Sequence, residues 1–84
     1  MYIMKTFDLV TRLFNNAVQT NMEVNNLQVN AYKVRVNGNI AYIEAVHVNE
    51  YSGVYGTKDV RTVYPTKKQL NRLQKLDFIV YEDW

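Results

Sequence analysis

The beginning of the chain carries an amphipathic helical pattern. Apolar side chains recur at helical spacing between Phe7 and Gln19, with polar side chains between them. Thr6 is the expected N-cap, and Asp8 lies in the first turn, where its charge suits the helix dipole and can pair with Arg12. The pattern predicts a helix over 7–19 that packs on another element through Phe7, Val10, Leu13, Phe14, Ala17 and Val18.

After a polar connection over 20–26, the period of the apolar side chains over 28–49 changes to two, which indicates β-strands. Asn37-Gly38 interrupts the alternation, and an Asn-Gly pair between two such runs is a strong hairpin signal. Two registers fit this turn. They are Val34 opposite Ala41 with Tyr32 opposite Ile43, for a two-residue turn, and Val34 opposite Ile40 with Tyr32 opposite Tyr42, for a three-residue loop.

The segment 49–59 holds two of the three glycines and the only serine, which predicts a long loop or a loosely formed hairpin tip. Alternation returns over 60–64 and predicts a third strand, which Pro65 ends. Thr66 and Gln69 then have the spacing of a capping box, so a second helix begins here and ends near Asp77. Its apolar stripe is Leu70, Leu73 and Leu76.

The run Phe78–Tyr81 is apolar without alternation, which favours a strand covered on both faces in the middle of a sheet. A short strand over 2–4 is compatible with the start of the chain. The resulting order is α-β-β-β-α-β in a single domain over 1–84. Because each helix has one apolar stripe, we expect a small α+β two-layer sandwich in which two helices cover a three- to four-stranded antiparallel sheet.

Composition removes several classes of chemistry. With no cysteine and one histidine, the 84 residues offer no disulfide, no cysteine or multi-histidine metal site and no thiol nucleophile. The glycines at 38, 53 and 56 form no phosphate-binding motif. The chain shows neither a signal-peptide pattern nor a long apolar run, so we expect a cytoplasmic protein without a cofactor, a metal or a membrane contact.

Candidate catalytic residues are few. His47, Ser52 and Asp59 are the residue types of a hydrolase triad, but the nucleophile elbow is absent and Ser52 lies on the expected loop. A small toxin-type ribonuclease that works with Arg, Lys and Tyr is a third hypothesis, and any enzymatic activity would be expected to disappear when His47 or Arg61 is replaced with alanine. The net charge of only +2 counts against it, and we expect a protein that is not an enzyme.

A basic stripe on the second predicted helix is the basis of an alternative function, nucleic-acid binding. Its side chains recur on one helix face, and two further cations share one face of a predicted strand. A single-stranded RNA platform would also need aromatic side chains on an open sheet face, for which Tyr32, Tyr42 and Tyr64 are available, although the core also needs them. The basic candidates are Lys67, Lys68, Arg72 and Lys75, with Lys33 and Arg35 on the strand.

The Tyr/Ser/Gly-rich segment 49–59 is the leading candidate for a binding site, because tyrosine offers a large contact area at low entropic cost and glycine lets the backbone fit a partner. The other reading is that its tyrosines fold back on the sheet edge. The protein-binding candidates are Tyr51, Ser52, Tyr55 and Lys58, with Tyr81 and Trp84 near the end of the sequence.

The first hypothesis is therefore a small non-enzymatic protein-binding module. The ten asparagines are compatible with an AT-rich genome, which favours a phage or mobile-element protein that inhibits or assists a larger host protein in the host cytoplasm. Homodimerisation through a strand edge or the first helix is compatible with the same sequence.

Overall fold

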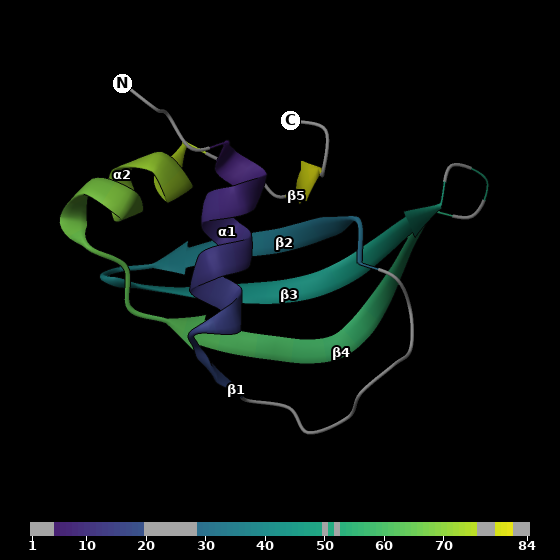
Figure 1. The fold of residues 1–84 in the computed structure, drawn as a ribbon, viewed down its shortest axis with the longest axis horizontal. Helices are drawn as coiled ribbons and strands as arrows, with labels where there is room; N and C mark the ends of the chain where they lie inside the picture. Colours follow the sequence, from purple (N-terminus) through teal and green to yellow (C-terminus); the bar gives the residue numbers. More distant parts are fainter. Residues whose placement is uncertain (1–4, 20–28, 50, 52, 76–78, 82–84) are drawn as a thin grey trace.

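Two helices and an antiparallel sheet make up the fold (Figure 1). The computed structural model describes residues 5–19, 29–49, 51, 53–75 and 79–81, and for 54–58 and 79–81 only the backbone. The sheet order is β1-β4-β3-β2-β5. The predicted α+β class and element order are confirmed, with a two-residue strand, β1, in addition. The elements are α1 (Thr6–Asn15), β1 (Val18–Gln19), β2 (Ala31–Asn37), β3 (Ile40–Asn49), β4 (Gly53–Val63), α2 (Lys67–Gln74) and β5 (Ile79–Tyr81).

The helix α1 differs from its prediction at both ends. Its N-cap is Lys5, which makes no side-chain capping bond, and Thr6 is already the first helical residue. The Thr6 hydroxyl instead accepts a hydrogen bond from Arg72 of α2 at 3.1 Å. The helix ends at Asn15 rather than at Gln19, because the following residues leave the helical path and Val18–Gln19 pair with the edge of β4.

The hairpin β2–β3 has neither of the two expected registers. Asn37 pairs with Ile40, so the turn consists of Gly38 and Asn39 rather than Asn37 and Gly38. Gly38 has a φ of 64°, as the first central residue of a type II′ turn requires. The prediction had placed this glycine second in the turn. The one-residue difference sets Val34 opposite Ile43 and Tyr32 opposite Ala45.

Most of the predicted loop 49–59 is strand. The connection between β3 and β4 is confined to residues 50–52, and β4 begins at Gly53, seven positions before the predicted start at Val60. The register shifts along this hairpin, because Glu44 pairs with Val60 whereas Val46 pairs with Gly56. Residues 57–59 therefore lie opposite Ala45 alone. This bulge contains the polar residues Thr57, Lys58 and Asp59, so they are accommodated without ending the strand.

One face of the sheet carries the core. Both helices contribute to it, since Val10 and Phe14 of α1 and Leu73 of α2 belong to the same buried cluster. The Tyr32 ring lies between Phe7 and Phe14, with ring centroids 5.1 and 5.4 Å apart. The buried cluster is completed by strand residues that alternate toward the helices: Tyr32, Val34, Ala41, Ile43, Ala45 and Val63.

The C-terminal elements agree in part with their prediction. The capping box is confirmed, since the Gln69 N–H donates to the Thr66 hydroxyl at 3.2 Å and the Thr66 N–H donates to the Gln69 side chain at 2.9 Å. The helix α2 ends at Gln74, before the expected Asp77. β5 pairs only with β2 and forms an edge, so its predicted position in the middle of the sheet is wrong. Leu76 and the expected strand over 2–4 lie outside the described residues.

Arg61 joins the end of α1 to β4. It lies opposite Ile43, where an apolar residue would be expected. Its Nη1 donates to the Phe14 carbonyl at 2.7 Å, and its guanidinium carbon lies 4.0 Å from the centroid of the Phe14 ring. Its Nη2 lies 3.1 Å from Asp59, whose carboxylate also accepts a hydrogen bond from Gln19 of β1 at 3.4 Å. We call the contacts among Arg61, Phe14, Asp59 and Gln19 the Arg61 clamp.

Replacing Arg61 with alanine should lower the free energy of unfolding by about 2 kcal/mol, because it removes charge-assisted hydrogen bonds and a cation–π contact. Urea denaturation measures the effect. Arg12→Ala, which removes an exposed arginine of α1, should change it by less than about 0.5 kcal/mol. Equal values for the two variants would contradict the role of the clamp.

Gly38→Ala should destabilise the fold by about 1 kcal/mol, since the positive φ disfavours any Cβ. Nothing lies within 4 Å of the place that this Cβ would take, so the cost is conformational rather than steric. Thermal unfolding of this variant beside Asn39→Ala tests the turn. A larger loss for Asn39→Ala would show that the turn conformation is assigned wrongly.

Candidate binding surface

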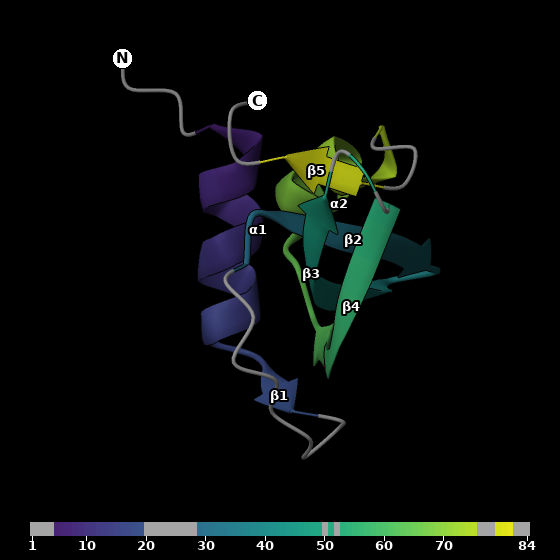
Figure 2. The same cartoon turned by 90° about the vertical axis from the view of Figure 1, so that its right-hand side faces the viewer.

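The face of the sheet opposite the core carries a mixed polar and apolar surface. Figure 2 shows α1 along one side of the sheet, and no helix or strand of the described residues lies over the other side. The side chains of this face alternate with the core positions, so the sheet pairing places them together. They are Lys33 and Arg35 of β2, Tyr42 and Glu44 of β3, Val60 and Thr62 of β4, and Val18 of β1.

One row of this face crosses four strands. Arg35 pairs with Tyr42, Tyr42 with Thr62, and Thr62 with Val18. The Arg35 guanidinium carbon lies 5.3 Å from the centroid of the Tyr42 ring, which is a cation–π contact. In the neighbouring row, the Lys33 Nζ forms an ion pair with the Glu44 Oε2 at 3.9 Å. The row therefore has a cationic and aromatic end on β2 and β3 and an apolar end on β1.

The uncovered region has a clear limit. Ala31 and Val46 share the parity of this face, yet both have no exposed surface. The exposed part of the face therefore begins at the row of Lys33 and continues toward Tyr64, which directly follows β4. We call this part, together with the cleft described next, the open face.

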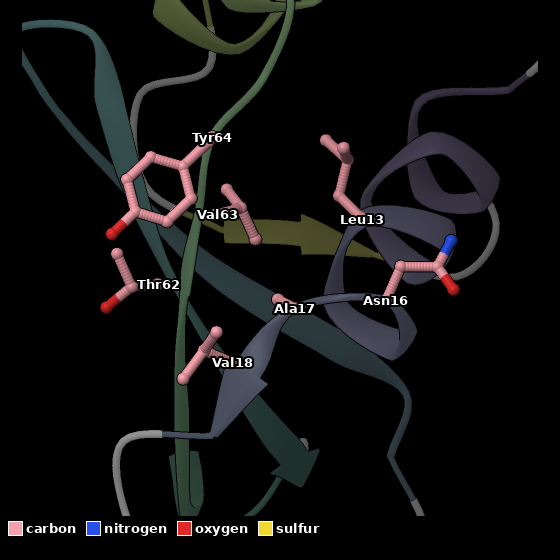
Figure 3. Close-up of a pocket in the computed structure, with 7 residues that line it drawn as sticks. All are labelled: Leu13, Asn16, Ala17, Val18, Thr62, Val63 and Tyr64. Carbon is pink, nitrogen blue, oxygen red and sulfur yellow. The ribbon is translucent and has the colours of Figure 1, made fainter.

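An apolar cleft lies at the sheet edge, between the end of α1 and the end of β4 (Figure 3). Its Val18 and Tyr64 wall borders the face described above, whereas Leu13 and Val63 belong to the helix side of the sheet. The cleft encloses about 230 Å³. In Figure 3, Leu13 of α1 and Val63 of β4 face one another, with Ala17 between the two elements. Val18 and Tyr64, which are 66% and 74% exposed, belong to its wall. The residues around it are Leu13, Asn16, Ala17, Val18, Thr62, Val63 and Tyr64.

The sequence does not reveal this cleft because Ala17 and Val18 fit the apolar stripe of the predicted helix. In the structure α1 ends before them, and Val18 faces away from the core in β1. The cleft therefore lies directly beside the point where α1 ends. The only sequence signal for it is Asn16, a residue suited to helix ends, which is the C-cap of α1.

The residues predicted for protein binding are spread over the molecule. Tyr51 is 90% exposed in the connection between β3 and β4, and its N–H donates to the Asn49 side chain at 2.8 Å. Tyr55 and Lys58 belong to β4, where only their backbone is described. Tyr81 lies on β5, which β2 and β3 separate from β4, so it does not join them. Ser52 and Trp84 lie outside the described residues.

The basic candidates do not form one surface. Lys67 and Lys68 on α2 and Lys75 at its C-cap are exposed, and the helix packs Leu73 into the core. Arg72 is half-buried and donates to Thr6 of α1, so it holds the two helices together. Lys33 and Arg35 alternate with the core residues of β2 and lie on the opposite face of the sheet. A single nucleic-acid strand would not meet both groups on one face.

The candidate catalytic residues have other contacts. His47 lies on β3 opposite Tyr55, and the Asp59 carboxylate is bound by Arg61. Arg61 itself is engaged within the clamp. Among the described residues, no three side chains of the His, Asp and Glu types come close enough together to hold a metal ion. Ser52, the third member of the sequence-derived triad, is not described.

Two further observations bear on identity. Comparison with known proteins finds no family model, no curated protein and no solved structure that matches the chain. Within the described residues, neither helix has the length and the apolar character needed to cross a membrane. The case for function therefore depends on the surface itself.

The first turn of α2 provides a test of the basic stripe. It contains Lys67 and Lys68 and no acidic residue, which is unfavourable at the positive end of a helix dipole. Replacing both lysines with glutamate should raise the free energy of unfolding by about 1 kcal/mol, whereas Lys75→Glu at the other end should lower it. Thermal and urea unfolding measure both effects. A loss of stability in the double variant would mean that these lysines make contacts the fold needs.

Proposed function

We propose that the protein is a small non-enzymatic module that binds another protein through the open face. The observation that carries the proposal is the apolar cleft, whose wall includes Val18 and Tyr64, two of the three exposed large hydrophobic side chains among the described residues. Exposed apolar groups that gather at a concave site are typical of interaction sites, whereas single ones are common on any surface.

The neighbouring row supports the same function. Arginine and tyrosine are enriched among the residues that dominate binding energies, and Arg35 and Tyr42 are already in contact with each other on this face. Both project from paired strands, so little conformational freedom remains to be lost when a partner binds. The surface thus combines an apolar pocket with a preorganised polar anchor.

Tyr51 is a second proposed contact. The ends of β3 and β4 continue beyond the pairing with β2, since His47 pairs with Tyr55 and Asn49 with Gly53. Tyr51 is at the tip of this hairpin and nearly fully exposed. A tyrosine there offers contact area to a large partner without any demand from the core. It lies at the opposite end of β4 from the cleft, so the two contacts can be tested separately.

The biological setting that we propose is a phage or mobile element whose product inhibits or assists a larger host protein in the host cytoplasm. The asparagine-rich composition supports this setting. Binding of nucleic acid is the alternative. It draws on the exposed lysines of α2 and predicts an affinity that falls steeply with salt.

Affinity capture from a host lysate, with and without nuclease, tests the proposed function. The double variant Val18→Lys, Tyr64→Ala should fold normally, because both side chains are mostly exposed. The amount of partner that it captures should fall about tenfold or more. Tyr51→Ala removes the other exposed tyrosine, at the second proposed contact, so comparing the two variants shows which contact holds the partner.

The outcomes separate the surfaces. Undiminished capture by the folded cleft variant, with capture lost in Tyr51→Ala, would place the contact at the hairpin tip. Capture that disappears with nuclease would support the nucleic-acid alternative. Turnover of a substrate that is lost in a folded His47→Ala variant would contradict the non-enzymatic assignment.

A further inference from the structure

Arg35 has no acidic partner among the described residues. Its contact is with the Tyr42 ring, whereas the one carboxylate of the neighbouring row, on Glu44, lies near Lys33. A guanidinium in a cation–π contact can still bind a carboxylate in a bidentate manner through its N–H groups. The open face thus presents a positioned cation for which the described residues supply no anion.

The cleft lies at a defined distance from this cation. Arg35 is on β2, and the row that contains it runs over β3 and β4 to Val18 on β1. Neighbouring strands are about 4.8 Å apart, so the cleft is about 10 to 14 Å from Arg35. An extended peptide rises about 3.3 Å per residue and covers this distance in about three or four residues.

We propose that the open face binds an acidic, extended segment of a partner protein, with an Asp or Glu side chain on Arg35 and an aliphatic side chain, about three or four residues away, in the cleft. This inference rests on the proposed function and adds the chemistry of the partner. The charge of the face and the apolar cleft are complementary to the two ends of such a segment.

The open face fits a peptide better than a nucleic acid. One side of the Tyr42 ring is already occupied by Arg35 rather than free for a base to stack on it. The exposed lysines of α2, which would add phosphate contacts, project from the helix layer. An aliphatic side chain, in contrast, is the natural occupant of a cleft bounded by Leu13, Ala17 and Val63.

A library of short random peptides, selected on the immobilised full chain, tests the proposal. The selected peptides should carry Asp or Glu and a Leu, Ile or Val at the stated spacing. In fluorescence anisotropy, Arg35→Ala should weaken their binding about tenfold or more, as should replacing the peptide's acid by its amide or its aliphatic residue by serine. Arg12→Ala, which removes an exposed arginine from α1, should leave binding unchanged.

Amide chemical shifts in NMR locate the bound peptide and separate the outcomes. Shifts at Arg35, Thr62 and Val18 caused by acidic peptides support the inference. Neutral peptides that shift the same amides with no loss in Arg35→Ala would overturn it and leave the proposed function standing. Peptides that shift only other amides, or no selected peptide at all, would overturn both. Oligothymidylate that shifts these amides at physiological salt, with no binding of acidic peptides, would replace the protein partner by a nucleic acid.

Discussion

The guanidinium of Arg61 is the group on which the arrangement of this edge of the molecule depends. It occupies a position of β4 that faces the helix layer, and it donates to a carbonyl in the last turn of α1 while it stacks on the ring of the same residue, Phe14. Helix ends leave carbonyls in need of donors, and a cation at this end also suits the helix dipole. Asp59 balances the charge and, through Gln19, connects it to β1. The end of α1, the end of β1 and the strand β4 thus meet at one charged group.

The local patterns of the sequence predict the elements but not their junctions. The alternation of β2 and the capping box at Thr66 are properties of neighbouring residues, and both are confirmed. The end of α1 was predicted wrongly because Ala17 and Val18 continue the helical stripe, and only their pairing partner on β4, distant in the sequence, takes them out of it. The strand character of 53–59 was missed for the same reason, since pairing with β3 outweighs the loop preference of the glycines.

The site shows the same division between local and distant information. That Lys33 and Arg35 share a strand face follows from the period of two, and so could be predicted. The contact between Arg35 and Tyr42 depends on the register of the hairpin. That register is set by the position of Gly38 as the first central residue of the turn. The cleft forms only where α1, β1 and β4 come together. A pattern within one segment carries no information on such a space, and the leading sequence candidate, Tyr51, accordingly lies at the other end of β4.

The sheet is built from contacts of very different range. The central strands β2, β3 and β4 are joined by two tight hairpins, whereas β1 and β5 reach their partners only across most of the chain, as with Val18 and Thr62 or Tyr32 and Val80. Closing a long loop costs conformational entropy, and a strand of two or three residues forms only a few hydrogen bonds to offset that cost. We therefore expect the outer strands to open more readily than the central ones, in local fluctuations that leave the hairpins intact. Since β1 supplies one wall of the cleft, the pocket belongs to a part of the sheet that we expect to open first. Occupation of the pocket and the closing of that edge would accordingly reinforce each other.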